Sequence, residues 1–122
     1  MSQKLPFTPF SITCREQLFT FEKPAIMGIL NATPDSFYDG GRYTSEELIV
    51  KRAHQLIDEG ADIIDIGVVS SRPGAQLLPP EEEASRLAPI VQQVRKAIPQ
   101  ALISVDTCYS LPARKAVEAG AD

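Results

Sequence analysis

Three short apolar segments, each followed by a stretch of helical periodicity, constrain the fold of this chain most strongly. The segments are predicted strands at about 25–30 ("AIMGIL"), 61–67 ("ADIIDIG") and 101–106 ("ALISVD"), and the intervening patterns predict helices at about 45–59, 80–97 and 111–119. Strand–helix units joined by right-handed crossovers form a parallel sheet. The sequence therefore predicts an α/β fold, either an open doubly wound sheet or part of a (β/α)8 TIM barrel.

The ends of the predicted helices carry recognisable signals. Thr44 and Glu47 have the spacing of a capping box, and Gly60 is placed to end the first helix. Pro80 suits the first turn of the second helix, whereas Pro89 should kink or divide it. Ser110 is the candidate cap of the third helix.

The chain is short for a complete barrel. The signal "EGAD" at 59–62 introduces the second strand, and "AGAD" at 119–122 repeats it at the end of the 122 residues. A complete barrel takes roughly 250 residues. We therefore predict about three strand–helix units from the N-terminal part of a barrel, at residues 24–122. A β-hairpin segment at residues 1–23, turning at Arg15 and Glu16, precedes them.

Composition argues against several classes of function. The net charge of -4 disfavours a nucleic-acid or anionic membrane surface. No stretch approaches the length of a membrane span, and the N-terminus lacks a secretory signal. Cys14 and Cys108 have neither metal-binding nor redox spacing, so we expect reduced thiols and a cytoplasmic location. The single histidine, His54, is expected on a helix surface.

Ligands of parallel α/β folds bind in the loops that follow the strands, and the first two of these loops are long. The first loop, 31–43, is about twice the usual length of 2–6 residues. It is interpreted as a mobile lid over a ligand, with a packed surface loop as the alternative. The second, "GVVSSRPGAQLLPP", offers the hydroxyls of Ser70 and Ser71 and the guanidinium of Arg72. Arg72 indicates an anionic ligand such as phosphate or pyrophosphate, unless it forms a surface ion pair.

Polar residues also occur in or directly after the predicted strands. Asp65 and Asp106 lie in apolar segments, where an unpaired carboxylate is costly. Each should therefore have a partner: a cation, a metal, the N–H groups of a polar heterocycle, or a structural pairing to backbone or arginine. Asn31 ends the first strand and offers a neutral oxygen that suits a hard cation such as Mg²⁺.

The order and spacing of four motifs resemble dihydropteroate synthase, an enzyme family of folate biosynthesis. They are "IMGILNATPDSFYDGG", "GADIIDIGVVSSRPGA", "EEEASRLAPIV" and "ISVDT". The resemblance covers residues 24–122 and implies the first part of a (β/α)8 barrel that is a homodimer when complete. It also implies cytoplasmic condensation of p-aminobenzoate with 6-hydroxymethyl-7,8-dihydropterin pyrophosphate. The products would be 7,8-dihydropteroate and pyrophosphate.

The resemblance also implies roles for individual residues. Asn31 would bind Mg²⁺ and pyrophosphate, Asp106 would hydrogen-bond the pterin ring, and Arg72 would belong to the second loop over the site. These three would be the catalytic residues. The first loop would contact p-aminobenzoate near Pro34 and Phe37, where sulfonamides compete. The full set of implied substrate-binding residues is Thr33, Pro34, Asp35, Ser36, Phe37, Asp65, Ser71, Arg72 and Asp106.

Departures from the family pattern leave other functions open. Before the arginine of the second loop the family has glycine, glutamate, serine and threonine, whereas this chain has Val68, Val69, Ser70 and Ser71. In the first motif Ala32 replaces a valine. The alternatives are a non-catalytic pterin-binding paralogue and a folate-dependent methyltransferase-like barrel, which "TPDSF" disfavours. Because the family's later strands are missing here, we expect this segment alone to be inactive and to associate through open strand edges.

Overall fold

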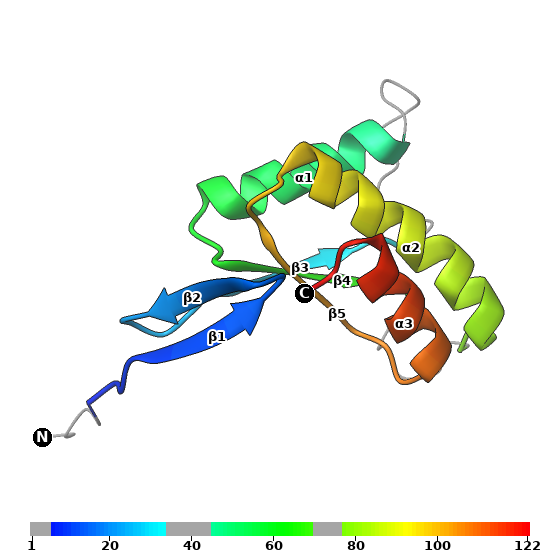
Figure 1. Ribbon diagram of the computed structural model, residues 1–122. Helices are drawn as coiled ribbons and strands as arrows, with labels where there is room; N and C mark the ends of the chain where they lie inside the picture. The colour runs from blue at the N-terminus through cyan, green and yellow to red at the C-terminus, as the bar shows by residue number, and fades with distance from the viewer. Residues whose placement is uncertain (1–5, 34–44, 70–76) are drawn as a thin grey trace, which may run out of the picture.

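The computed structural model describes residues 6–33, 45–69 and 77–122. A β-hairpin comes first, and three strands that alternate with helices follow it (Figure 1). In chain order the elements are β1 (Phe10–Cys14), β2 (Gln17–Phe21), β3 (Met27–Asn31), α1 (Ser45–Asp58), β4 (Ile63–Gly67), α2 (Pro80–Ala97), β5 (Leu102–Val105) and α3 (Ser110–Ala119).

Strands β3, β4 and β5 form a parallel sheet in the order β3-β4-β5. Ile29 lies opposite Asp65, and Asp65 lies opposite Ser104. Each strand therefore pairs with its neighbour along the chain, and all three carboxyl ends lie at one edge of the sheet. The predicted α/β architecture with three strand–helix units after a hairpin is confirmed.

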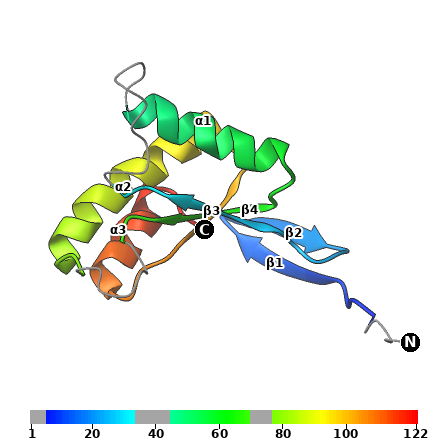
Figure 2. The same ribbon diagram turned by 180° about the vertical axis from the view of Figure 1, so that it is seen from behind.

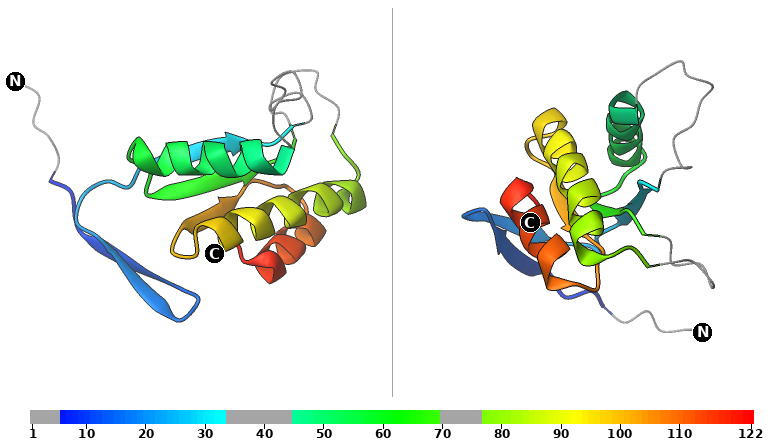
Figure 3. Two further views of the ribbon diagram at one scale, coloured as in Figure 1. Left: turned by 90° about the horizontal axis from the view of Figure 1, so that it is seen from above. Right: turned by 90° about the vertical axis from the view of Figure 1, so that its right-hand side faces the viewer.

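One face of this sheet packs against the helices (Figures 1 and 3). Alternate strand residues point to this face because side chains alternate along a strand. Leu30, Ile64, Ile66 and Ile103 are each at most 1% exposed and form the sheet's part of the core. The helices contribute Ile49, Ala53, Leu56, Leu87, Ile90, Val91, Val94 and Ala116.

The opposite face of the sheet is open only in part over the described residues, since Leu102 of β5 is 7% exposed there. Met27 and Ile29 of β3 are 51% and 64% exposed, although both are apolar. Asp65 of β4 and Ser104 of β5 lie beside them on the same face. This face is the one that points to the interior of a closed barrel, and its central positions are polar.

The helix ends agree with most of the sequence signals. Gly60 has φ +111° and ends α1, and Pro80 occupies the first turn of α2. Two expectations were not met. Pro89 does not divide α2, which runs unbroken over eighteen residues, and the alternative of a kink stays a prediction. Ser110 does not cap α3, because the helix already includes it and no side-chain capping bond forms. The predicted capping box at Thr44 lies outside the described residues.

The N-terminal hairpin projects from the end of the sheet where the strands begin (Figure 2). Its turn residues Arg15 and Glu16 have φ values of 50° and 62°, which fit the left-handed pair of a tight two-residue hairpin turn. The rings of Phe10 and Phe21 stack across the strands with centroids 5.1 Å apart. The turn itself contacts the core domain, since the guanidinium of Arg15 donates to the carboxylate of Asp122 at 2.5 Å.

The two "GAD" signals form the same structure. Asp62 accepts a hydrogen bond from the backbone N–H of Ile26 through its side chain and returns one from its own N–H to the Ile26 carbonyl, both at 2.8 Å. Asp122 makes the same pair with Ile103, at 2.9 and 2.8 Å. Each aspartate therefore fixes the chain after a helix against the strand before that helix. We call these two arrangements the aspartate clips.

In the Asp122 clip the carboxylate also forms ion pairs with two arginines. Arg15 donates to Oδ1 of Asp122, and Arg95 donates to Oδ2 at 2.7 Å, while the Asp122 side chain is only 5% exposed. Burial alone raises the pKa of this carboxyl. The Ile103 N–H and the two guanidinium groups outweigh that effect and hold the pKa of Asp122 below its ordinary value of 3.8.

Candidate functional site

The carboxyl ends of the three strands bring Asn31, Gly67 and Asp106 into a row. Asn31 is the last residue of β3 and pairs with Gly67, the last residue of β4. The N–H of Asp106 donates to the carbonyl of Ile66 at 2.9 Å, so Asp106 lies beside the same end of β4. The predicted placement of Asn31 and Asp106 at neighbouring strand ends is confirmed.

Gly67 lies between Asn31 and Asp106 in this row. A Cβ atom at position 67 would lie 3.8 Å from the Cβ of Asp106. A larger side chain would therefore project into the space beside Asp106 and between it and Asn31. Both Asn31 and Asp106 are exposed, so a ligand can reach the amide and the carboxylate from the open face of the sheet.

A second polar pair lies on the same sheet face, two residues before Gly67 and Asp106 along the chain. The hydroxyl of Ser104 donates to Oδ1 of Asp65 at 2.5 Å, and both residues are half-buried. The expectation that Asp65 has a partner is confirmed, and the partner is a neutral hydroxyl rather than a cation. Ser104 was not singled out from sequence. The signal was available, because Ser104 and Asp106 are two residues apart and share one face of an extended strand.

The other predicted site residues divide into two groups. Thr33 follows β3 and is half-buried. Pro34, Asp35, Ser36, Phe37, Ser71 and Arg72 lie outside the described residues. Asp106 follows β5 rather than lying within it and is exposed, and its expected partner stays a prediction.

The two unusual valines of the second loop belong to the core side of the molecule. Val68 is 3% exposed and joins the hydrophobic cluster, and Val69 is half-buried against it. The apolar surface of Val68 therefore stabilises the junction between β4 and the loop that follows. Neither valine provides a polar group near Asn31 or Asp106.

A buried contact supports the loop that carries Asp106. Glu83 in the first turn of α2 is 3% exposed, and its carboxylate accepts a short hydrogen bond from the hydroxyl of Thr107. The same hydroxyl accepts a hydrogen bond from the N–H of Tyr109 at 3.3 Å. Neither Glu83 nor Thr107 was singled out from sequence, because three consecutive glutamates at a helix start indicate only a favourable interaction with the helix dipole.

The polar groups of this edge fit only certain metals. Over residues 6–33, 45–69 and 77–122, no three His, Cys, Asp or Glu side chains come together as a metal site. The amide oxygen of Asn31 is a single hard donor. Mg²⁺ fits such a donor, because it retains several waters and is often held by one or two protein oxygens plus substrate phosphates.

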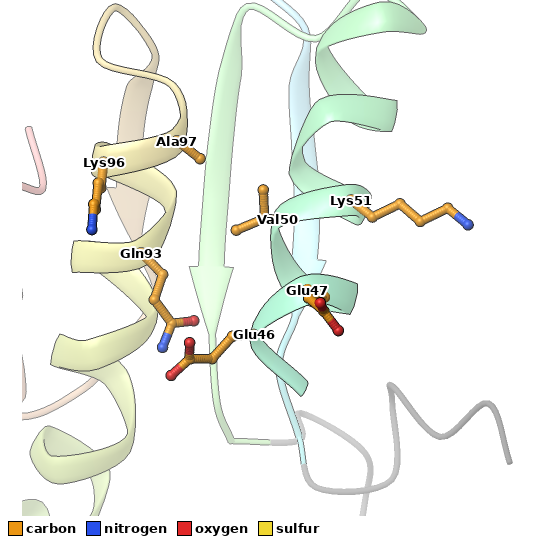
Figure 4. Close-up of a pocket in the computed structure, with 7 residues that line it drawn as sticks. All are labelled: Glu46, Glu47, Val50, Lys51, Gln93, Lys96 and Ala97. Atoms are coloured by element: carbon orange, nitrogen blue, oxygen red, sulfur yellow. The ribbon is translucent and has the colours of Figure 1, made fainter. Parts of the chain in front are cut away.

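Apolar and charged grooves occur elsewhere on the surface. One is a surface groove of about 640 Å³ between α1 and α2, lined by Glu46, Glu47, Val50, Lys51, Gln93, Lys96 and Ala97 (Figure 4). It lies on the outer helix layer, away from the open sheet face. In the part of the chain that the structure describes, no helix is long and apolar enough to cross a membrane.

Comparison with known proteins identifies the relatives of this arrangement. A family model described as "Pterin binding enzyme" matches residues 27–122. A dihydropteroate synthase of Bacillus subtilis is 49% identical over 100 residues, which cover 82% of this chain and 35% of the relative. The chain thus spans little more than a third of that relative's length.

Solved structures agree with the sequence relatives. A Xanthomonas albilineans dihydropteroate synthase with 4-aminobenzoic acid has a TM-score of 0.81 at 42% identity, covering 91% of this chain and 41% of that one. A Burkholderia cenocepacia dihydropteroate synthase complexed with 7,8-dihydropteroate has a TM-score of 0.75 at 40% identity, covering 95% and 37%. The three strand–helix units described above therefore match part of these larger structures.

Proposed function

This chain belongs to the family of pterin-binding enzymes, and from that premise we propose that it forms the N-terminal part of a dihydropteroate synthase. In the proposed reaction, the amine of p-aminobenzoate forms a bond to the methylene carbon of 6-hydroxymethyl-7,8-dihydropterin pyrophosphate. The bond from that carbon to pyrophosphate breaks, and the amine loses a proton. The observation that carries this proposal is the row of Asn31, Gly67 and Asp106 at three successive strand ends.

The roles proposed for the described residues follow from their chemistry. The carboxylate of Asp106 accepts N–H groups of the pterin ring, because an ionised carboxylate is an acceptor only. Asp65 and Ser104 form the polar floor beneath the ring, where their mutual hydrogen bond fixes the carboxylate. Gly67 leaves room for the flat ring between the strand ends.

We propose that the pyrophosphate binds at Asn31 and the second loop. Asn31 would hold Mg²⁺ through its amide oxygen, and bound Mg²⁺ supplies charge neutralisation for the departing pyrophosphate. Arg72 and Ser71 are proposed to donate to the same group, and Thr33 through Phe37 to contact p-aminobenzoate. These assignments rest on the family resemblance, since all of these residues except Asn31 and Thr33 lie outside the described ranges.

Two wider properties are part of the proposal. A homodimer of the complete protein is proposed from the family resemblance. A cytoplasmic location is proposed because Cys14 and Cys108 are both free thiols.

A domain replacement tests the proposal. The part of the Bacillus subtilis synthase that matches this chain is replaced by residues 24–122, and the hybrid is assayed with pterin pyrophosphate, labelled p-aminobenzoate and Mg²⁺. Labelled dihydropteroate is the expected product, and the 122-residue chain alone should give none. A hybrid that folds and binds neither substrate would refute the proposal.

A non-catalytic pterin-binding role is the second candidate. It is favoured by Val68 and Val69, which put apolar side chains where the family has glycine and glutamate. Under this alternative the hybrid binds 6-hydroxymethylpterin but forms no product, and the double substitution Val68→Gly with Val69→Glu restores turnover. Turnover by the unmodified hybrid excludes it.

A further inference from the structure

We propose that Glu83 is a positioning residue for Asp106, acting through Thr107; this inference rests on the proposed function, in which Asp106 binds the pterin. The starting observation is a contrast among three consecutive glutamates. Glu81 and Glu82 are exposed, whereas Glu83 is 3% exposed. Glu82 forms a surface ion pair with Arg86 at 2.7 Å, which needs no burial.

Burial of a carboxylate is costly unless hydrogen bonds compensate for the lost water. The hydroxyl of Thr107 provides such a bond to Glu83. A hydrogen bond to an ionised acceptor is about twice as strong as a neutral one. The position of Glu83 in the first turn of α2 adds the favourable field of the helix N-terminus. The carboxylate is therefore stable where it is and holds the hydroxyl firmly.

Thr107 transmits this constraint to the site. It follows Asp106 directly, and its hydroxyl both donates to Glu83 and accepts from the N–H of Tyr109. On the other side, the N–H of Asp106 is bonded to the carbonyl of Ile66 in β4. Asp106 is thus fixed from two directions, by the sheet before it and by α2 after it.

The geometry explains why an exposed carboxylate can have a defined direction. Asp106 itself makes no side-chain hydrogen bond within the described ranges that would orient it, so its direction depends on the backbone at 106–109. The bond to Glu83 is the one side-chain hydrogen bond between this loop and α2 in the part of the chain that the structure describes. The backbone N–H of Glu83 donates to the carbonyl of Pro79 at 2.9 Å, so Glu83 is itself fixed at the start of α2.

The first measurement follows the loop in the 122-residue chain, without any ligand. Amide hydrogen exchange is recorded for the variant that combines Glu83→Leu with Thr107→Val. Replacing both partners by apolar groups of similar size leaves neither of the two side chains unsatisfied, but it also removes the acceptor of the Tyr109 N–H. Glu83→Leu alone keeps that acceptor, and we expect exchange at Tyr109 to accelerate about tenfold or more in both variants, while exchange in β4 stays as in the wild type. Glu82→Leu is the matched control and should change neither.

The second measurement follows pterin binding in the hybrid enzyme. The double variant should bind 6-hydroxymethylpterin roughly 10-fold to 100-fold more weakly, because small displacements of a binding group have effects of this size. Thr107→Ser keeps the hydroxyl and should bind as the wild type does, whereas Thr107→Val should lose affinity.

The two measurements separate this inference from the proposed function. Unchanged exchange at Tyr109 in Glu83→Leu, or unchanged pterin affinity in the double variant, would overturn the role of Glu83. Faster exchange throughout β4 as well would also overturn it, since the contact would then serve general stability. A wild-type hybrid that binds no pterin refutes the proposed function instead, and the exchange data still decide whether Glu83 holds the loop.

Discussion

The Asp122 clip provides the sharpest quantitative prediction, because the chain contains its own control in Asp62. Asp122 accepts three hydrogen bonds, two of them from guanidinium groups, and its side chain is 5% exposed. Asp62 accepts one hydrogen bond, from a backbone N–H, and forms no ion pair within the described ranges. We therefore compare two single variants of this chain, Asp122→Asn and Asp62→Asn.

The expected costs follow from these contacts. A hydrogen bond to a charged group contributes about 1.5–3 kcal/mol and an ordinary one about 0.5–1.5 kcal/mol, and contacts within one network do not add fully. Asparagine keeps one side-chain oxygen as an acceptor. Its NH2 group then faces one of the two arginines and cannot accept a hydrogen bond from it. Arg95 is then left 16% exposed without a counter-charge. We expect a loss of roughly 2–4 kcal/mol for Asp122→Asn and about 0.5–1.5 kcal/mol for Asp62→Asn.

The contribution of Asp122 to the free energy of unfolding decreases in acid. Because the pKa of Asp122 is lowered in the folded state, its contribution is complete above the ordinary value of 3.8 and is lost as pH falls from there through the folded pKa. The difference in unfolding free energy between wild type and Asp122→Asn should therefore be constant near neutral pH and shrink below 3.8. This difference in unfolding free energy is measured by urea unfolding followed by far-UV circular dichroism. Equal costs for the two variants, or a difference that persists in acid, would refute this account of the clip.

Three further predictions concern the site, a turn and the core. Asp106→Ala in the hybrid enzyme should abolish pterin binding in calorimetric titration while leaving its melting temperature unchanged; normal binding would contradict the proposed role. Gly120→Ala should cost more than Gly60→Ala, because both have positive φ but only at Gly120 would the new Cβ lie 3.0 Å from Arg95. Backbone strain of this kind costs about 1–3 kcal/mol, and equal losses in urea unfolding would count against the close contact. Ile66→Ala should cost about 2–5 kcal/mol by cavity formation in the same measurement.

The alternation of apolar strands and periodic helices was sufficient to predict the sheet. Which side chains face the helices was not predictable from this pattern, because neighbours such as Ile29 and Leu30 are both apolar and only Leu30 is buried. The end of α1 was also predictable, since only glycine readily adopts the φ of +111° at Gly60. The unbroken course of α2 through Pro89 was not, because tertiary packing of a long helix outweighs the loss of one backbone bond.

The site was predictable in position but not in its internal contacts. Asn31 and Asp106 were placed correctly, because the ends of parallel strands meet at one edge. The bond from Ser104 to Asp65 depends on strand register, and the bond from Thr107 to Glu83 joins residues 24 positions apart. The spacing of Ser104 and Asp106 indicates that they share a face, but no local signal gives the partners of Ser104 and Thr107. Tertiary contacts of this kind emerge only when the elements are in place.

The order of the strands in the sheet has a consequence for synthesis on the ribosome. Each of β3, β4 and β5 pairs with the strand that left the exit tunnel before it, so the sheet can grow in the direction of translation. Each aspartate clip closes as soon as a helix and its following aspartate have emerged, and it ties them to a strand already made. Once Asp122 has left the exit tunnel, both aspartate clips can form. We therefore expect ribosome-bound chains of this length or longer to resist proteases.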